Sequence, residues 1–452
     1  MEDKAHIPLP SPALTLLSLL EGAGFEAWCV GGFVRDALIG RKAGDIDIAS
    51  SAPWDKAQAL FEAQGLKTFE TGVKHGTLTV LVGSDALEVT TFRTDGTYTD
   101  GRRPDSVTFV ESIEEDLARR DFTMNAIAYH PERGLFDPQG GQRDIEARVI
   151  RAVGEARTRF AEDALRILRG VRFASQLGFS LEEATRKAMV EQRGLLEIVA
   201  AERVSHELGA LICGAFVRDT LLAHTDIIGQ VLPELLPMKG FDQKTPYHVF
   251  DVLEHTACCM ENTRPCALVR WAALFHDSGK PAAFFTDDAG VGHFYGHAKI
   301  SVTIAQTAMR RLRLPRALVS DVLLLVEHHD DILAATPKSV KRMLRKLGGR
   351  PEMFFALTEL KRGDAAAQAP HCRHRVGLAH ELDAVLEAVL EAGEVFSLHD
   401  LAIDGKDLKA LGIPPGPLYK ELLEGALESV LSGQVPNEKP SLIASIQGRL
   451  EP

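Results

Sequence analysis

The sequence predicts an α+β protein, with an N-terminal α/β head followed by an all-helical body. Up to about residue 114, short strand-like runs alternate with helix-like segments. Beyond that point the apolar residues recur at helical spacing, with few strand signals among them. The length of 452 residues is too great for one hydrophobic core and favours two to four domains.

The head is expected to hold two groups of strands. Residues 25–30 and 45–49 read as strands, and residues 32–38 between them have the pattern of a short helix. Residues 76–82 and 87–92 are predicted to form a strand pair, because a Gly-Ser-Asp turn signal separates them.

Amphipathic helices are expected after the head. Their apolar residues recur at helical spacing in four stretches, residues 117–129, 159–176, 181–192 and 201–213. The rest of the chain is also expected to be helical, and the sequence contains no internal repeat.

The bulk composition is that of a soluble globular protein, with 45% hydrophobic and 25% charged residues. A net charge of −12 means that any site for a polyanion must be a local basic patch. The six cysteines form no CxxC pair, which suits a reduced, cytoplasmic protein. The sequence has neither a signal peptide nor an apolar run of about 20 residues, so no membrane association is expected.

The stretch WCVGGFVRDALIGRKAGDIDIAS in the head combines a double glycine with two carboxylates. Residues i and i+2 of a strand share a face, so Asp45 and Asp47 are expected to project together. Paired carboxylates suit Mg²⁺ and can hold two metal ions for an in-line displacement. Gly31 and Gly32 allow the backbone to approach a phosphate closely, and Arg35 is one helical turn further on. The pattern therefore predicts a phosphate and metal site.

The pattern G-G-x-x-R-D followed by D-x-D resembles the active-site signature of the nucleotidyltransferase superfamily, which includes DNA polymerase beta. More narrowly, the chain resembles class II tRNA nucleotidyltransferases, the bacterial CCA-adding enzymes, and bacterial poly(A) polymerases. The resemblance covers almost the whole chain and is most specific over residues 30–177. It implies a polymerase-beta-like head with Asp45 and Asp47 as catalytic metal ligands.

Two further segments fit the same family in order. In EDLARRDFTMNAIAY, residues 115–129, the resemblance implies that Arg119 and Arg120 contact sugar and phosphate, with Arg120 the better match. Residues 137–154 resemble the turn and connector that join the head to the next domain.

The segment EDALRILRGVRFASQL carries the prediction about base choice. Asp163 and Arg166 are expected to be i,i+3 neighbours on one helix. Their acceptor and donor are complementary to the edges of cytosine and adenine, whereas guanine and uracil present the reverse pattern and would leave polar groups unpaired. The resemblance implies that this pair is the template for base choice. Arg169 continues the same ridge, while Arg172 is rotated by about half a turn from Asp163.

Two features of the head bear on the product. The loop DGTYTDGRRP, residues 95–104, resembles the flexible loop of enzymes that add the whole CCA, which argues against addition of C alone. Residues 74–81 resemble the tRNA-type members more than the poly(A) polymerases. Glu88 is interpreted first as a carboxylate at the edge of the core, and alternatively as a neighbour of the metal pair.

A second motif lies in the helical body. Its order H…HD…H…H…D resembles the HD-superfamily metal phosphohydrolases, and imidazole with carboxylate suits Ni, Mn, Co or Fe. Such a metal would activate a water for attack on a phosphoester. His248 is favoured as the first ligand, and His255 as either a ligand or its partner. The candidate ligands are His248, His255, His276, Asp277, His297, His329 and Asp364.

Four domains are predicted from these features. They are a catalytic head (1–150), a neck for base recognition and RNA binding (151–240), an HD domain (245–370) and a helical tail (371–452). The basic run at residues 338–350 would hold the acceptor or T arm of tRNA through phosphates, or else form a solvated helix face.

The function predicted from the resemblance is addition of C, C and A to the tRNA 3′ end, with CTP and ATP as substrates and pyrophosphate as product. An A-adding enzyme or a poly(A) polymerase would share nearly every motif and stays open as an alternative. An HD phosphohydrolase whose head only binds RNA is the second alternative, against which the intact Asp45–Asp47 pair argues.

Overall fold

The computed structural model describes residues 7–42, 44–95 and 107–450. The chain divides into two compact units, residues 1–233 and residues 234–452. Among the described residues, no helix is both long and apolar enough to cross a membrane.

A seven-stranded mixed sheet organises the head, in the order β3-β4-β5-β2-β1-β8-β9. Strands β2 and β5 pair in parallel, and their neighbours in the sheet pair antiparallel. The predicted β4–β5 pair is confirmed, whereas β3, β8 and β9 were not predicted. The strands are β1 (Ala27–Val30), β2 (Asp47–Ser50), β3 (Lys67–Gly72), β4 (Thr77–Val82), β5 (Asp85–Thr91), β8 (Ala128–His130) and β9 (Gly134–Phe136).

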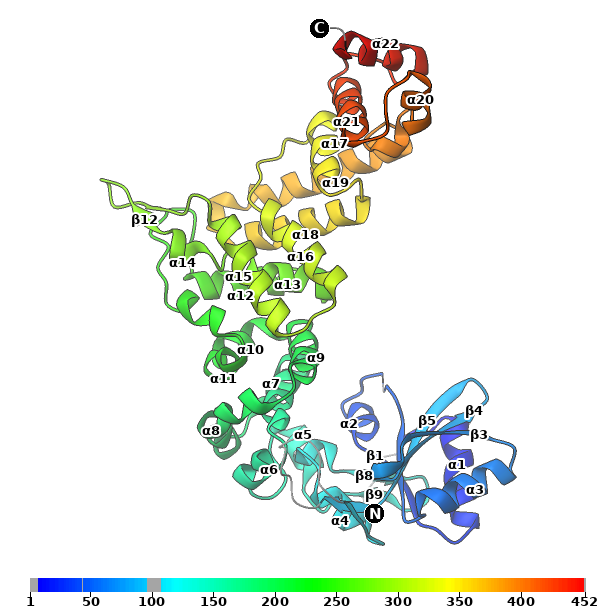
Figure 1. Cartoon of the computed structure of the whole chain (residues 1–452). Helices are drawn as coiled ribbons and strands as arrows, with labels where there is room; N and C mark the ends of the chain where they lie inside the picture. Colours follow the sequence, from blue (N-terminus) through cyan, green and yellow to red (C-terminus); the bar gives the residue numbers. More distant parts are fainter. Residues whose placement is uncertain (1–6, 43, 96–106, 451–452) are drawn as a thin grey trace. The chain divides into compact units, whose positions relative to one another are not determined.

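Three helices accompany the sheet (Figure 1). Helices α1 (Ser11–Gly22) and α3 (Trp54–Ala63) contact each other and the strands, and bury apolar side chains such as Leu16 and Phe61. Helix α2 (Gly32–Leu38) follows β1 directly and has the bounds that the sequence predicted. A short pair, β6 (Arg93–Asp95) and β7 (Val107–Phe109), lies apart from the main sheet, and α4 (Ile113–Ala118) follows it.

The predicted helix over residues 117–129 is wrong. Helix α4 ends at Ala118, a 3₁₀ turn covers Thr123–Asn125, and the chain then enters β8. The Asp121 carboxylate accepts hydrogen bonds from the Phe122 amide and the Asn125 side chain. These local bonds offer the backbone an alternative to helix, which the apolar spacing did not reveal.

The predicted helix over residues 159–176 is also corrected, because it consists of two helices. Helix α6 (Ala156–Glu162) ends at Asp163, which is extended with φ −139° and ψ 102°, and α7 (Leu165–Leu177) begins after it. The Asp163 carboxylate accepts a hydrogen bond from the Leu165 amide, at 3.1 Å, as a capping side chain does. Asp163 and Arg166 therefore do not lie on one helix.

The rest of the first unit is mainly helical. The parallel pair β10 (Val149–Ile150) and β11 (Ser180–Leu181) links its parts. The predicted helices at residues 181–192 and 201–213 are confirmed as α8 and α9. The helices are α5 (Gly141–Glu146), α8 (Glu183–Gln192), α9 (Ala201–Ile212), α10 (Val217–Ala223) and α11 (Thr225–Val231).

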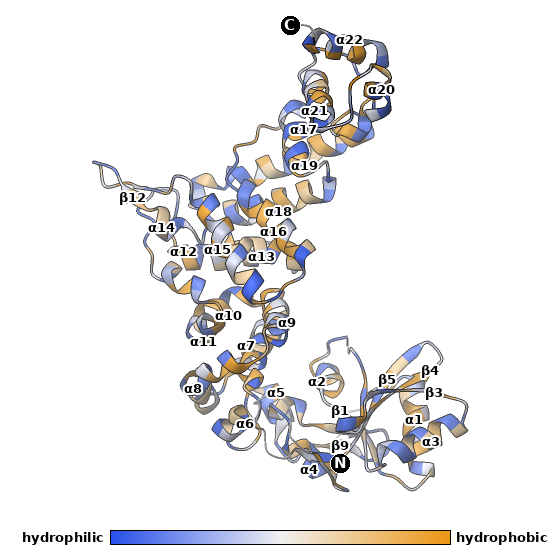
Figure 2. Ribbon diagram, in the orientation of Figure 1, coloured by the Kyte–Doolittle hydropathy of each residue, from blue (hydrophilic) through white to orange (hydrophobic). Residues whose placement is uncertain are grey.

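The second unit is a helical assembly with one small hairpin, β12 (Phe285–Thr286) and β13 (Gly292–His293). Hydrophobic and hydrophilic residues alternate along its helices (Figure 2), as burial of one side of each helix requires. Its last part has a core of its own, which includes Leu408, Leu427 and Leu442. The helices are α12 (Val252–Glu261), α13 (Ala267–Phe275), α14 (Lys280–Ala283), α15 (His297–Arg311), α16 (Arg316–His328), α17 (Pro337–Lys346), α18 (Pro351–Ala367), α19 (His374–Glu391), α20 (Gly405–Ala410), α21 (Pro417–Leu431) and α22 (Lys439–Leu450).

Candidate active site

A polar pocket of about 450 Å³ lies in the first unit, between the start of α2 and helices α7 and α9. All nine of the predicted nucleotide-binding residues line it, and so does Asp47, one of the two predicted metal ligands. The predicted residues that line the pocket are Gly31, Gly32, Arg35, Asp47, Arg119, Arg120, Asp163, Arg166, Arg169 and Arg172. The sequence did not point to five further lining residues, Asp121, Asn125, Leu165, Phe173 and Arg203.

The double glycine forms a tight turn between β1 and α2. Gly31 has φ +76°, which is in the left-handed region that L side chains rarely adopt. A Cβ at this position would lie 3.0 Å from Arg120 Nη1 and 3.7 Å from Asp47 Oδ2. Glycine is thus required both by the backbone angle and by the close approach of the turn to a carboxylate and a guanidinium.

Asp47 is the first residue of β2 and is half-buried at the pocket wall. Burial raises the pKa of Asp47 to about 6; Arg120 acts against this shift, whereas Glu88 and Asp45 add to it. Glu88 is the register partner of Asp47 on the adjacent parallel strand β5 and is exposed. The interpretation of Glu88 as a core-edge carboxylate is therefore wrong.

Asp45 differs from its prediction. Strand β2 begins at Asp47, so Asp45 lies before the strand, is exposed and is not among the residues that line the pocket. Its charge still acts on Asp47. Asp45 and Glu88 thus both act electrostatically on Asp47, and carboxylate oxygens are the donors that a hard divalent cation prefers, so the chemistry of these side chains suits such an ion.

Arg119 and Arg120 are held by one buried carboxylate, Asp116 on α4. Asp116 lies 2.7 Å from Arg119 Nη2 and 3.1 Å from Arg120 Nη2. Burial acts to raise the pKa of Asp116, but the charges of Arg120 and Arg119 outweigh it and hold the pKa below its ordinary value. Asp116 thereby fixes both cations where they reach the pocket.

A chain of polar contacts joins α2 to α7. Arg35 Nη1 donates to Asn125 Oδ1 at 2.7 Å, and Asn125 Nδ2 donates to Asp121 Oδ1 at 3.0 Å. The other oxygen of Asp121 accepts from Arg169 Nε at 2.8 Å. Because each side chain holds the next, Arg35 and the helix α7 cannot be placed independently.

The chain of contacts continues to α9. Glu207, which is buried, lies 2.7 Å from Arg172 Nε and 3.8 Å from Arg169 Nη1. The Arg172 guanidinium also lies over the Phe173 ring, 4.1 Å from its centroid. Arg172 therefore reaches the pocket, even though it is rotated away from Asp163.

Asp163 and Arg166 both line the pocket, but their side chains do not pair with each other. Asp163 Oδ2 lies 2.8 Å from Arg203 Nη2 on α9. Arg166 instead donates from Nη1 to the Glu162 carboxylate at 2.7 Å and from Nη2 to the Arg119 carbonyl at 3.0 Å. The predicted loop at residues 95–104 lies outside the described residues, except for Asp95 at the end of β6.

A second cluster of titratable groups lies in the other unit, around Asp277. Asp277 Oδ2 lies 3.3 Å from His255 Nε2 and 3.2 Å from His276 Nε2. Its Oδ1 lies 3.3 Å from His297 Nε2 and 3.6 Å from His329 Nε2. The Asp277 carboxylate thus faces two pairs of imidazoles, His255 with His276 and His297 with His329. In each group of two histidines and Asp277, one ligand atom of every residue lies within 4.8 Å of those of the other two.

The four histidines of this cluster share one orientation. In each, Nδ1 faces a backbone carbonyl, those of Ala367, Ala273, Phe294 and Val326, at 2.7–3.4 Å. An Nδ1–H that donates there leaves the lone pair on Nε2 directed at Asp277. Asp364 Oδ1 adds a further acceptor, 3.0 Å from His255 Nε2. These lone pairs and carboxylates fit a transition-metal ion.

The preference for His248 as the first ligand is corrected in favour of His255. Helix α12 begins only after the capping residue Asp251, so His248 is not on the helix that carries His255. His248 Nε2 lies 3.3 Å from the buried Lys280 Nζ, which in turn lies 2.7 Å from Asp277. Lys280, in the sequence HDSGK, is a member of the cluster that the sequence analysis missed.

The mixed sheet, the Gly31 turn and the carboxylate and arginines of the first pocket define a nucleotidyltransferase with a polymerase-beta-like head. The "Poly A polymerase head domain" model matches residues 27–151, and the "Probable RNA and SrmB- binding site of polymerase A" model matches residues 178–239. The "tRNA nucleotidyltransferase domain 2 putative" model matches residues 297–446. The chain belongs to the family of the CCA-adding enzymes.

Its relatives are similar over nearly the whole length. The CCA-adding enzyme of Geobacillus kaustophilus is 36% identical, over 97% of this chain and 96% of that protein. The crystal structure of the Bacillus stearothermophilus CCA-adding enzyme in complex with CTP is 32% identical, covers 98% of both chains and has a TM-score of 0.73. The Thermotoga maritima CCA-adding enzyme complexed with tRNA_CCA is 22% identical with a TM-score of 0.55, and shares the fold.

Proposed function

We propose that this protein adds C, C and A to the 3′ end of tRNA, using CTP and ATP and releasing pyrophosphate. The observation that supports it best is the pocket of the first unit. There the Gly31 turn and Asp47 line one pocket with five arginines, two of the 119–120 segment and three of α7, and Asp163 lines the same pocket. A triphosphate needs the cations, and a base needs the acceptor, so the set suits a nucleoside triphosphate.

In this reaction one group of residues binds the phosphates and another holds divalent cations. Arg35 and Arg120 bind phosphate oxygens, and the glycine turn lets the backbone come close to them. Asp45, Asp47 and Glu88 would hold divalent cations, for which Mg²⁺ is the hard, oxygen-preferring choice. When bound, such ions neutralise the triphosphate and lower the pKa of the attacking 3′ hydroxyl.

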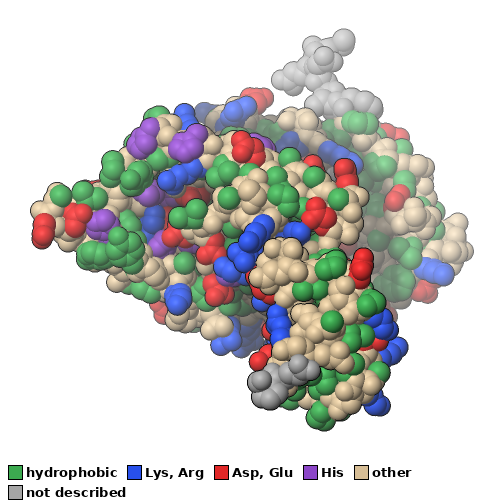
Figure 3. All heavy atoms as spheres, turned by 90° about the horizontal axis from the view of Figure 1, so that it is seen from above, with side chains coloured by type: hydrophobic (Ala, Val, Ile, Leu, Met, Phe, Trp, Pro, Cys, Tyr) green, Lys and Arg blue, Asp and Glu red, His purple; other side chains and the backbone are tan. Residues whose placement is uncertain are grey.

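We propose tRNA as the partner that supplies this hydroxyl, through its 3′ end and its acceptor and T arms. The basic helix α17 is one candidate surface, but Arg342 and Arg345 each form an ion pair with Glu428 at 2.8–2.9 Å. Basic and acidic side chains are mixed over the face shown in Figure 3. The contact with RNA is therefore assigned first to the neck, residues 151–240. We place the reaction in the cytoplasm, in keeping with the six free cysteines.

The test uses tRNA transcripts that end before CCA, with each nucleotide supplied separately and then together, and products sized on a gel. We expect two additions with CTP alone and three with CTP and ATP. Asp47→Ala should abolish addition, whereas Asp85→Asn, an exposed change on β5, should not. Incorporation of ATP but never of CTP would replace this proposal with an A-adding enzyme or a poly(A) polymerase.

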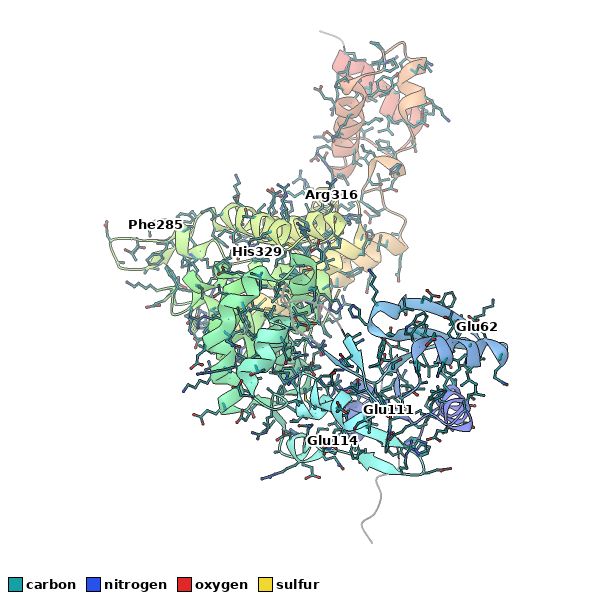
Figure 4. The ribbon with its side chains drawn as sticks, turned by 60° about the horizontal axis from the view of Figure 1, so that its bottom comes forward. Glu62, Glu111, Glu114, Phe285, Arg316 and His329 are labelled. Carbon is teal, nitrogen blue, oxygen red and sulfur yellow. The ribbon has the colours of Figure 1, made fainter. Side chains whose placement is uncertain are left out.

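A second candidate activity is a metal-dependent phosphohydrolase in the predicted HD domain, residues 245–370. The observation that favours it is the convergence of four imidazole Nε2 atoms on Asp277. A pocket of about 370 Å³ reaches two members of the cluster, His329 and Asp364, and is also lined by Lys361 and Arg375. His329 lies within the helical bundle, at the end of α16 (Figure 4).

This candidate is tested by metal analysis together with phosphatase assays. We expect the full chain to retain a first-row transition metal through gel filtration, and to release phosphate from a generic phosphomonoester. His276→Ala should remove both properties and leave nucleotide addition intact. A metal-free wild-type protein that does not gain phosphatase activity with added Mn²⁺ or Ni²⁺ would exclude the activity.

A further inference from the structure

Three aromatic side chains form an exposed stack at the β12–β13 hairpin, which projects from the helices of the second unit (Figure 1). The His293 ring lies beside Phe285, with centroids 5.3 Å apart and planes at 28°, and beside Tyr295, at 5.5 Å and 22°. The exposed fractions of Phe285 and Tyr295 are 46% and 77%. Single apolar residues are common on protein surfaces, but a contiguous group of rings indicates an interaction surface.

The other side of the hairpin is fixed to the body of the unit. Phe284 packs edge to face on Phe241, with ring centroids 5.2 Å apart, and also contacts Phe294 at 5.6 Å. The Gly292 amide donates a hydrogen bond to the Lys244 carbonyl at 2.8 Å. These contacts hold the hairpin, and with it the exposed stack, in place before a partner binds, which reduces the entropy lost on binding.

The hairpin carries negative charge beside the stack. Residues 281–298 include two aspartates, Asp287 and Asp288, but no lysine or arginine. Both aspartates are exposed, and Asp287 Oδ2 lies 2.8 Å from His293 Nε2. Carboxylates at this place repel the phosphates of a nucleic acid and attract a cation. A guanidinium group suits both features of the hairpin, because it stacks on aromatic faces and pairs with carboxylates.

We propose that this stack, formed by Phe285, His293 and Tyr295, binds a short arginine-bearing segment of a partner protein. The guanidinium groups of the segment stack on the rings, while Asp287 and Asp288 attract their charge. Lysine meets the same carboxylates but has no planar group to cover a ring. The inference goes beyond nucleotide addition, since none of these residues lines the pocket of the first unit.

The experiment measures the binding of labelled peptides to the full chain by fluorescence anisotropy. One peptide has three arginines separated by glycine and serine, and the second has lysine at the same positions. We expect the wild-type chain to bind the arginine peptide more tightly. The double variant Phe285→Ser, Tyr295→Ser should weaken that binding roughly 5- to 30-fold, the scale of two exposed cation–π contacts, and make the two peptides bind alike.

Phe69→Ser on β3 is the matched control, because Phe69 is 49% exposed and belongs to the first unit. It should bind both peptides as the wild-type chain does. Because the changed rings are exposed, all variants should keep the wild-type rate of nucleotide addition, which verifies that they fold. Asp288→Asn should weaken the binding of the two peptides by the same factor, since its charge attracts either cation.

The proposal is overturned if the double variant binds the arginine peptide as tightly as the wild-type chain does. It is also overturned if the affinity for a single-stranded oligoribonucleotide falls in its place, because the rings then stack on bases. Sedimentation velocity tests the remaining occupant. A wild-type dimer that the double variant converts to a monomer would overturn the proposal as well, because the stack would then cover a second copy of the chain.

Discussion

Asp47 and Glu88 are register partners on the parallel strands β2 and β5, so that Glu88 is the neighbour of a carboxylate that lines the pocket of the first unit. Their mutual repulsion is one reason why the pKa of Asp47 is raised to about 6, after burial and against the effect of Arg120. A carboxylate pair of this kind is costly without a cation, so under the proposed function a divalent cation held here, beside the Gly31 turn, would also meet the triphosphate.

The first prediction concerns Glu88→Gln. Removing this charge weakens the cation site while the strand register is kept, so we expect a higher Mg²⁺ concentration for half-maximal nucleotide addition and a kcat about tenfold or more lower. A Mg²⁺ titration of the addition rate provides the measurement. Glu70→Gln, an exposed change on β3, should leave the titration curve unchanged. An unshifted curve for Glu88→Gln would place Glu88 outside the metal site.

The second prediction separates two reasons for a glycine at position 31, which are the positive backbone angle φ and the close approach of Arg120. Gly31→Ala should cost about 1–2 kcal/mol in the free energy of unfolding, because φ is +76°. It should also abolish most activity, since the new methyl group would displace Arg120. Gly24 has φ +86° with nothing within 4 Å, so Gly24→Ala carries the strain alone. The measurements are the free energy of chemical unfolding and the rate of nucleotide addition for both variants. If the two variants were equally active, the close approach of Arg120 to position 31 would not be the reason for the glycine.

The third prediction concerns the pH dependence of the Asp116 contacts. The arginines hold the pKa of Asp116 below its unfolded value, so its stabilising effect is present above a pH of about 4 and is lost as the pH falls below it. Asp116→Asn should therefore lower the free energy of unfolding by up to about 3 kcal/mol at pH 7, since Arg119 and Arg120 keep some contact with water. At acidic pH the difference from wild type should shrink.

Denaturant unfolding at pH 7 and near pH 3.5 tests this, with Glu114→Gln on the exposed side of α4 as the control. A difference between Asp116→Asn and wild type that stays constant with pH would show that the carboxylate charge is not the cause.

The fourth prediction concerns His224, which is buried between α10 and α11. Burial, and secondarily Arg186, lower its pKa to about 4, below the unfolded value near 6.5. The neutral imidazole is then favoured in the folded state. Its contribution is full above pH 6.5 and is lost as the pH falls from 6.5 towards 4, by up to about 3 kcal/mol.

His224→Gln should flatten the decline in melting temperature over this pH window. His206→Gln on α9 is the control, because the His206 side chain is 81% exposed. If both variants decline in parallel with wild type, His224 does not titrate as described.

The sequence predicted the head site well because its residues are close along the chain. Gly31, Arg35 and Asp47 lie within one motif, and helix α2 has the predicted bounds. The error at Asp45 arose because alternation fixes which residues of a strand share a face but does not fix where the strand starts. The 117–129 error has a related origin, since the hydrogen bonds of Asp121 are invisible to apolar periodicity.

Contacts between distant segments could not be predicted in the same way. Asp163 and Arg203 are 40 positions apart, and nothing local in either segment indicates that they meet. The same holds for Arg172 and Glu207, which join α7 to α9. The histidine cluster was predicted as a set, but the choice between His248 and His255 depended on where α12 begins, which the Asp251 cap decides.

The contacts that run from Arg35 through Asn125 and Asp121 to Arg169 have a consequence for exchange of parts between relatives. They span residue 150, the predicted boundary between head and neck, with Asp47 on one side and Arg203 on the other. A chimera joined at that boundary would take Arg35, Asn125 and Asp121 from one parent and Arg169 from the other, so these contacts would form only if the two parents match across the junction. Interchangeable halves would therefore have to be joined after α9, so that every residue that lines the pocket of the first unit comes from one parent.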